Sequence, residues 1–338
     1  MRAALLPARK PARAPGGRQL KVLVTGGSGF IGSHVVDKLT AAGHDPRILD
    51  VASSPWHAPG AVDTTIGDVT DAGAVAAAVS GCDAIVHLAA MADVYQVVEQ
   101  PERTDAVNVR GTFNLLEAAR AHGLSRFLYA STIWVYGNAP GPGPHDEDTA
   151  LVLPPHLYTA TKLAGEMYCR SFETLYGVST TILRFGIPFG PRARPAAVIP
   201  AFIARALAGE RLVIAGDGGA TRQFVYIEDL AEGVVAALHA EAAGRVYNLV
   251  GDELVSVREV ADTIRELVAD VPLEYGPGRP ADLVFGRASG ERPAAELGWR
   301  PQTSFREGVR RYVDWLAVTN GSPVAAAASS TAGSAATV

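Results

Sequence analysis

A glycine-rich turn near the start of the chain constrains its fold most strongly. Gly26, Gly29 and Gly32 lie in the segment TGGSGFIGSH, between a β-rich run at residues 21–25 and an amphipathic stretch at residues 30–42. Such glycines let a strand turn tightly into a helix and leave bare backbone at the positive end of that helix, where a phosphate group can bind. The alternative is an ordinary tight turn, and the strand and helix on either side argue against it.

Short β-rich runs and amphipathic helical stretches alternate along most of the chain. This alternation is typical of a parallel sheet covered on both faces, so the sequence predicts an α/β fold with a doubly wound parallel (Rossmann) sheet. After Phe185 the alternation weakens, which indicates a smaller C-terminal domain. Further strands are expected at residues 47–50, 62–66, 83–88, 127–131 and 180–185. Helices are expected at residues 72–79, 106–121, 157–176, 199–208, 227–239 and 257–268.

The composition excludes several classes of protein. With 48% hydrophobic and 19% charged residues, a chain of 338 residues can bury a full globular core. From Val22 onward it holds 24 basic against 35 acidic residues, a charge that disfavours a nucleic-acid partner. Charged residues interrupt the richest apolar stretch, residues 72–94, so no membrane span is expected. Cys82 and Cys169 are too few for a disulfide framework or a zinc site, which fits the reducing cytoplasm.

An acidic residue beyond the glycine turn indicates the cofactor. Asp50 ends the second expected strand, about 20 residues after the turn, where a carboxylate can accept hydrogen bonds from the ribose hydroxyls of an adenosine. Residues 51–54 contain no Lys or Arg to neutralise a 2′-phosphate, so NAD is preferred to NADP. For Asp50, the alternative is an ordinary carboxylate at the surface. For Ala89 and Ala90, at the end of a later expected strand, the alternative is that they simply form a buried strand end. Further cofactor contacts are expected at the next strand ends, from Asp68, Val69, Leu88, Ala89 and Ala90.

Three polar residues form a candidate catalytic group. Tyr158 and Lys162 are spaced i,i+4, so they share one face if residues 157–168 are helical. A neighbouring ammonium and an oxidised nicotinamide would both favour the phenolate form of the tyrosine, which makes it a better base. Thr132 ends the expected strand in ASTIWVYG, where its hydroxyl can bond the same substrate oxygen. His34, His87 and His156 lack the spacing of metal ligands, so no metal is expected.

Taken in order, these motifs resemble the extended short-chain dehydrogenase/reductases. TGGSGFIG, Asp50, the segment NVRGT that begins at Asn108, ASTIWVYG and YTATK follow the order of that family over residues 21–316. The segments IAGDGGATRQFVYIEDL and GRPAD resemble its NAD-dependent nucleotide-sugar epimerase/dehydratase branch. The resemblance implies NAD contacts from Gly26, Gly29, Phe30, Ile31, Gly32, Asp50, Asp68, Val69, Leu88, Ala89, Ala90, Asn108, Tyr158 and Lys162.

The same resemblance implies roles for residues on the substrate side. Tyr158, Lys162 and Thr132 would be catalytic, while Arg222 and Arg279 would hold the diphosphate of a UDP-sugar. Guanidinium groups suit phosphate oxygens because two parallel hydrogen bonds can form, although a structural salt bridge is the alternative for each arginine. Asp282 would lie beside these arginines or near the nucleotide ribose, and the amphipathic helices at 106–121 and 157–176 would form a homodimer interface.

These roles suggest a division of the chain into segments. A flexible leader at residues 1–19 precedes an NAD-binding domain at 20–186, and residues 224–252 are expected to return to that domain. Residues 187–223 and 253–318 form the expected substrate-binding domain. Residues 319–338 are rich in Ala, Ser, Thr and Gly without charge, so they are expected to be a flexible tail.

Two residues after Thr132 narrow the expected reaction. Dehydratases of this branch carry Asp and Glu there, and related decarboxylases keep the Glu, whereas this chain has Ile133 and Trp134. Neither side chain can serve as an acid or base for elimination, so a 4-epimerase is expected, which oxidises C4 transiently and returns the hydride to the opposite face. For Trp134 itself, a role in packing alone is the favoured alternative to a role in the site. A net dehydrogenase and a non-catalytic NAD-binding module stay open as alternatives.

The substrate is less closely defined. Ile187 replaces the Asn usual in glucose/galactose epimerases, and the run GPRARP from Gly190 resembles UDP-glucuronate 4-epimerases. Arg194 would then bind a substrate carboxylate, and its alternatives are the diphosphate or a protein interface. The pair UDP-glucuronate/UDP-galacturonate is therefore favoured, with UDP-glucose/UDP-galactose as the alternative. Together with a composition rich in Ala, Gly and Arg, this suggests a biosynthetic enzyme for a glycosylated natural product.

Overall fold

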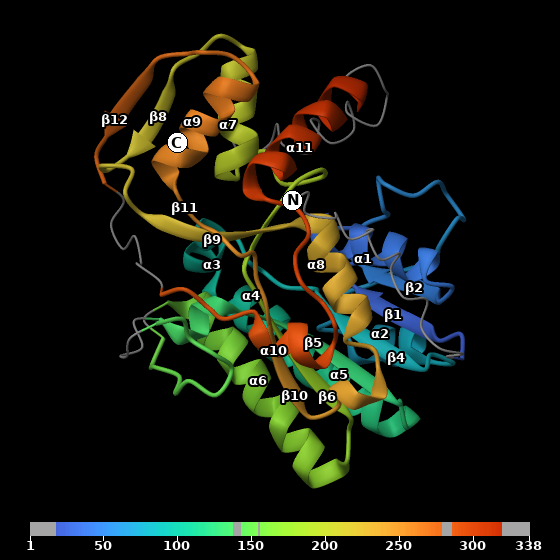
Figure 1. Cartoon of the computed structure of the whole chain (residues 1–338). Helices are drawn as coiled ribbons and strands as arrows, with labels where there is room; N and C mark the ends of the chain where they lie inside the picture. Colours follow the sequence, from blue (N-terminus) through green and yellow to red (C-terminus); the bar gives the residue numbers. More distant parts are fainter. Residues whose placement is uncertain (1–17, 138–142, 155, 279–285, 320–338) are drawn as a thin grey trace, which may run out of the picture.

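A parallel sheet of seven strands forms the centre of the computed structural model, which describes residues 18–137, 143–154, 156–278 and 286–319 (Figure 1). The strand order is β10-β6-β5-β4-β1-β2-β3, so the direction of winding reverses between β1 and β4. This confirms the predicted doubly wound sheet, and ligands of such sheets bind at the reversal point. The strands are β1 (Lys21–Thr25), β2 (Asp45–Asp50), β3 (Asp63–Ile66), β4 (Ala84–His87), β5 (Arg126–Thr132), β6 (Thr180–Phe185) and β10 (Arg245–Leu249).

Helices cover both faces of the sheet because the central strands are apolar on both sides. Val22 and Val24 of β1 belong to the core that α1 (Phe30–Ala41) and α8 (Ile227–Ala236) cover. Leu23, which points to the opposite face, belongs to the core beneath α2 (Ala72–Val79), α5 (Gly111–His122) and α6 (Leu157–Tyr176). Near-continuous apolar strands are the pattern expected of a parallel sheet that is buried on both faces.

The expected helix at residues 106–121 differs from the structure. Its first part is a π-helical turn at Ala106–Arg110, which follows the short helices α3 (Val94–Glu99) and α4 (Pro101–Asp105) and precedes α5. Asn108 is buried in this turn, and its carbonyl oxygen accepts a hydrogen bond from the Thr112 hydroxyl at 2.6 Å. Apolar periodicity does not register the extra residue of a π turn, so the sequence pattern predicted one regular helix.

A smaller C-terminal region lies beside the carboxyl ends of the strands, at the upper part of Figure 1. Its three-stranded sheet has the order β11-β9-β7, and a second sheet pairs β12 with β8. The elements are β7 (Ile187–Phe189), α7 (Val198–Leu207), β8 (Leu212–Ala215), β9 (Thr221–Tyr226), β11 (Leu254–Ser256), α9 (Val257–Leu267), β12 (Leu273–Gly276) and α11 (Phe305–Thr319). The short helix α10 (Glu291–Glu296) instead packs against β10 of the central sheet. Single 3-10 turns lie at Ile133–Tyr136 and Ala240–Ala242.

The sequence also predicted a flexible leader and a flexible tail. Residues 1–17 and 320–338, which make up most of the expected leader and tail, lie outside the described residues.

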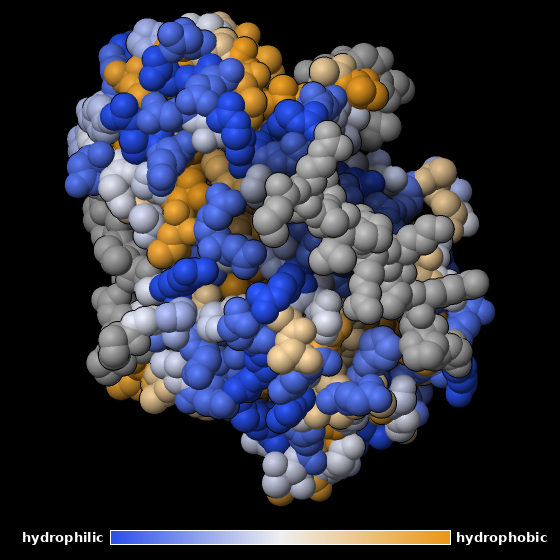
Figure 2. Space-filling view, viewed as in Figure 1, coloured by the Kyte–Doolittle hydropathy of each residue, from blue (hydrophilic) through white to orange (hydrophobic). Residues whose placement is uncertain are grey.

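Within the described ranges, no helix is long and apolar enough to span a membrane. Polar residues cover much of the visible surface (Figure 2). Cys82 and Cys169 are both buried and free.

Candidate functional site

The glycine turn lies at the carboxyl end of β1, beside the point where the sheet reverses direction. Gly26 has φ +70, and a Cβ atom there would lie 2.9 Å from the backbone nitrogen of Ala89. A Cβ atom on Gly32 would lie 2.1 Å from the carbonyl oxygen of Gly26. Both positions therefore require glycine, one for its backbone conformation and both for space. The turn packs against the segment after β4 and leaves backbone exposed at the start of α1, which fits a dinucleotide pyrophosphate.

Asp50 lies directly beside this turn. The backbone nitrogen of Ser28 donates a hydrogen bond to Asp50 Oδ2 at 3.0 Å, and the backbone nitrogen of Ala52 donates to Oδ1 at 3.3 Å. Burial raises the pKa of the Asp50 carboxyl above its ordinary range, while these hydrogen bonds oppose the rise. The carboxylate is thus held at the end of β2, where the adenosine ribose of NAD would contact it.

The next strand ends line the same edge of the sheet. The backbone nitrogens of Leu88 and Ala89 both donate to the Thr25 hydroxyl at 3.2 Å, which joins the segment after β4 to β1. The same hydroxyl lies 2.8 Å from Nδ1 of His87, and burial lowers the pKa of that histidine to about 3. His87 is therefore a neutral structural residue that fixes the strand ends. The side chains of Phe30 and Ile31, in the first turn of α1, pack partly against the core.

Two other expected cofactor residues already have protein partners. Asp68 accepts hydrogen bonds from Arg103 and from the backbone and hydroxyl of Thr70. Burial acts to raise the pKa of Asp68, but these donors outweigh it and the pKa lies below its ordinary range. Asn108 bonds the backbone of Met91 on both sides of its amide, at 2.8 and 3.0 Å, and donates to Thr161 at 3.0 Å. Their contacts to NAD stay predictions.

The three expected catalytic residues lie at one edge of the sheet. Tyr158 and Lys162 occupy the first turns of α6, whose N-terminus is capped by His156: its Nδ1 accepts a hydrogen bond from the Tyr158 backbone nitrogen at 3.1 Å. Lys162 Nζ lies 6.0 Å from the centre of the Tyr158 ring. Thr132 is the last residue of β5, and the indole of Trp134 lies 6.0 Å from the Tyr158 ring, centre to centre. The predicted catalytic group is therefore assembled from β5 and α6.

Burial shapes the acid–base properties of this group. It raises the pKa of Tyr158 to about 12, with the charge of Arg194 opposing the rise, and it lowers the pKa of Lys162 to about 8. The phenol is consequently protonated at neutral pH unless further positive charge lies near it. An oxidised nicotinamide is such a charge, so a bound cofactor would favour the phenolate.

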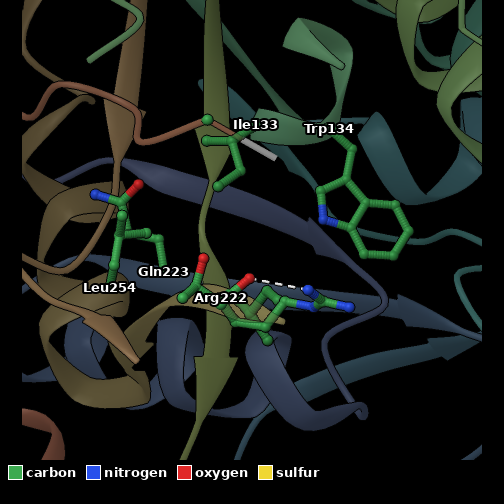
Figure 3. A pocket seen from close by; sticks show the side chains of 8 residues that line it. Ile133, Trp134, Arg222, Gln223 and Leu254 are labelled. Atoms are coloured by element: carbon green, nitrogen blue, oxygen red, sulfur yellow. Dashed lines mark hydrogen bonds between the residues drawn. The ribbon is translucent and has the colours of Figure 1, made fainter. Parts of the chain in front are cut away.

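A small pocket lies beside Trp134, between the turn after β5 and the strands β7, β9 and β11 (Figure 3). Trp134 and Ile133 follow Thr132 on one side, and Arg222 of β9 extends its guanidinium toward the space beneath the indole. Arg222 Nη1 also donates a hydrogen bond to the Thr221 carbonyl at 2.9 Å. The pocket is lined by Ile133, Trp134, Ile187, Thr221, Arg222, Gln223, Leu254 and Gly286. The other expected diphosphate and ribose residues, Arg279 and Asp282, lie outside the described residues.

The loop after β7 carries arginines with different surroundings. Arg194 forms an ion pair with Asp93 at 2.7 Å, and more than half of its side chain is exposed. Arg192 has φ +67, the only positive φ among the described non-glycine residues. Its guanidinium pairs with Asp37 of α1 at 2.8 Å. Sequence reasoning missed both carboxylates because they lie far along the chain from the loop. The loop is thus tied to α1 and to the segment after β4.

Comparisons with known proteins show which family the chain resembles. A family model described as "NAD dependent epimerase/dehydratase family" matches residues 22–250. The dTDP-glucose 4,6-dehydratase of Shigella flexneri is 33% identical over 344 residues, covering 89% of this chain and 94% of that protein. The crystal structure of a UDP-glucose 4-epimerase from Thermotoga maritima with UDP-glucose superimposes with a TM-score of 0.84 at 30% identity, covering 89% and 100% of the two chains. MoeE5 in complex with UDP-glucuronic acid and NAD gives a TM-score of 0.81 at 30% identity, covering 88% and 99%.

Proposed function

The chain belongs to the NAD dependent epimerase/dehydratase family, and from this premise we propose that it is a UDP-sugar 4-epimerase that interconverts UDP-glucuronate and UDP-galacturonate. Dependence on NAD, expected from the glycine turn and Asp50, is a property of the family. The names of the similar proteins mention nucleotide sugars, and they include both epimerases and dehydratases. The choice between these two reactions is therefore the first question for this chain.

One observation carries the choice of epimerisation: apolar side chains flank the catalytic group where elimination would need an acid or base. Thr132, Tyr158 and Lys162 share one edge of the sheet, and the next two residues are Ile133 and Trp134. Ile133 is buried, and the ring of Trp134 packs edge-on against Tyr158. Neither can donate or accept the proton that loss of water from the sugar requires.

The residues at this edge support a reversible oxidation at C4. Bound NAD would supply a hydride acceptor beside the sugar. Tyr158 would take the proton of the C4 hydroxyl, Thr132 would orient that oxygen, and the Lys162 ammonium would favour the phenolate. The resulting 4-keto sugar would turn about its diphosphate linkage and take the hydride back on its other face, while Tyr158 returns the proton. Atoms and electrons then balance without net consumption of cofactor.

The preference for a uronate rests on Arg194. Its ion pair with Asp93 supports this preference, since the guanidinium already holds one carboxylate. The charge of Arg194 also acts on the pKa of Tyr158, so it lies within electrostatic reach of the catalytic group. In the substrate complex, the sugar carboxylate would replace the Asp93 carboxylate as the partner of Arg194. The chain also shares its fold with MoeE5, whose structure contains UDP-glucuronic acid.

NMR of the purified protein, with no added NAD, tests the proposal against UDP-glucuronate and UDP-glucose in parallel. Faster formation of UDP-galacturonate than of UDP-galactose supports a uronate epimerase with retained cofactor. Faster conversion of UDP-glucose would instead assign the neutral sugar. Stoichiometric loss of substrate to a ketone with growing absorbance of reduced nicotinamide would make the protein a net dehydrogenase. Conversion of neither sugar would reject the function.

We also propose a homodimer through α5 and α6. Met167, Leu175 and Tyr176 of α6 are each more than half exposed, which is unusual for large apolar side chains in one helix. Light scattering checks this: a mass near twice the 35.3 kDa of one chain supports the dimer, and a single-chain mass contradicts it.

A further inference from the structure

A buried ion pair joins the helix that carries Tyr158 to the strand beside β5. Glu166 lies in α6, one turn after Lys162, and Arg184 lies in β6; at most 2% of either side chain is exposed. Arg184 donates from Nη2 to Glu166 Oε2 at 2.7 Å and from Nε to Oε1 at 3.0 Å. Buried pairs add little net stability because desolvation of both charges offsets their attraction. Stability alone therefore does not explain this pair.

Ser131 connects the pair to the catalytic end of β5. Its hydroxyl donates a hydrogen bond to Glu166 Oε1 at 2.5 Å, and the next residue is Thr132. Lys162 Nζ donates to the carbonyl oxygen of Ala130 at 2.8 Å. Two consecutive residues of β5 are thus bonded to two consecutive turns of α6. These bonds fix both the height and the rotation of the helix relative to the strand.

The other side of Arg184 is also held in place. Nη1 donates to the Tyr136 hydroxyl at 2.9 Å, and that hydroxyl donates to Asn248 Oδ1 at 2.8 Å. The guanidinium carbon lies 4.9 Å from the centre of the Tyr136 ring. Any movement of Arg184 would leave buried polar groups without partners, which is costly. The guanidinium therefore presents Glu166 to Ser131 in one orientation.

We propose that Ser131, Glu166 and Arg184 form a clamp that sets the position of α6 against β5, and with it the distance from Thr132 to Tyr158 and Lys162. These are positioning residues, since they act through the catalytic group. The catalytic role of the clamp rests on the proposed function, because the distance matters only if those groups act on one hydroxyl. A misplacement of about 1 Å can lower a rate on the order of 100-fold.

The test is Ser131→Ala, which removes one bond of the clamp and leaves the ion pair intact. Glu166→Ala would leave a buried guanidinium unpaired and endanger folding. Ser179→Ala is the matched control. The hydroxyl of Ser179 accepts a hydrogen bond from buried Arg126 at 2.9 Å, and this bond lies at the amino ends of β5 and β6, away from Thr132. Both variants are expected to lower the melting temperature by similar amounts.

Only Ser131→Ala is expected to lower kcat for UDP-glucuronate, about 10-fold, with KM changed less than about twofold and NAD content as in the wild type. The kinetic isotope effect with substrate deuterated at C4 should rise, because hydride transfer becomes slower. Equal kcat and isotope effect in the two variants would overturn the clamp and make it merely structural.

If the wild type converts no UDP-sugar, the proposed function is overturned. The clamp is then tested by a second measurement that does not depend on activity. Crystal structures of the wild type and of Ser131→Ala would then be compared. A shift of α6 at Lys162 by more than about 0.5 Å relative to β5 supports the clamp, and an unmoved helix overturns it.

Discussion

The ammonium nitrogen of Lys162 donates a hydrogen bond to the backbone carbonyl oxygen of Ala130, with 2.8 Å between the two atoms. Only 4% of Lys162 is exposed, and burial lowers its pKa to about 8. The strand that ends in Thr132 thus holds the charged group beside Tyr158. This lysine, one of the three candidate catalytic residues, can therefore lose its proton at mildly alkaline pH.

This pKa predicts how stability depends on pH. Between about pH 8 and the pKa near 10.4 of a lysine in an unfolded chain, the unfolded state binds more protons than the folded state. The free energy of unfolding of the wild type, relative to Lys162→Met, should therefore rise with pH across this window, by up to about 1.4 kcal/mol per pH unit. Below pH 8 the difference should be constant. Urea unfolding of the NAD-free proteins at several pH values measures it, and parallel curves would contradict it.

Replacement of the candidate base should stop the reaction without loss of the cofactor. Tyr158→Phe removes the hydroxyl that would take the C4 proton, so kcat should fall by about 10²–10⁴-fold. NAD content should stay at the wild-type level, measured by absorbance after denaturation. Tyr275→Phe, at an exposed tyrosine of β12 in the C-terminal region, is the control and should keep full activity in the NMR assay. Undiminished turnover by Tyr158→Phe would exclude this tyrosine as the base.

The glycine turn should tolerate no side chain at its tightest point. A Cβ atom on Gly32 would lie 2.1 Å from the Gly26 carbonyl oxygen, so Gly32→Ala must displace the turn. We expect a variant that folds with a lower melting temperature and is purified with less than a tenth of the NAD. Gly276→Ala in β12 is the control, because a Cβ atom there would meet its neighbours only at 3.5 Å or more. Full NAD content in Gly32→Ala would contradict a cofactor site at this turn.

Comparing two substrates separates a specific role of Arg194, binding the substrate carboxylate, from general damage to the site. Arg194→Ala should raise KM for UDP-glucuronate about 10-fold, as expected for loss of a charge-assisted hydrogen bond, and leave KM for UDP-glucose within about twofold. Arg211→Ala is the matched control, since Arg211 forms a similar exposed ion pair with Glu274 at 2.6 Å in the C-terminal region. Equal effects on both sugars would assign Arg194 to the diphosphate or to the structure of the loop.

Patterns local in sequence predicted much of the fold and the core of the site. The strand Lys21–Thr25, the helix Ala72–Val79 and the strand Thr180–Phe185 have the predicted bounds. The three glycines and the spacing of Tyr158 and Lys162 each lie within a few residues, so geometry along a single turn or helix decides what they can do. Their predicted places in the structure, at one edge of a parallel sheet, followed from the alternation of strands and helices.

The tertiary structure alone decided which distant side chains meet. Glu166 reaches Ser131 across 35 positions of the chain, and Arg194 reaches Asp93 across 101. A pattern of residue types has no signal for such pairs, because any of many carboxylates could satisfy a given hydroxyl or guanidinium. Packing of α6 onto β5, and of the loop after β7 onto the segment after β4, selects one partner from these. The sequence by itself therefore determined the fold and the cofactor and predicted the catalytic residues, while the folded chain determined which side chains hold these residues in place.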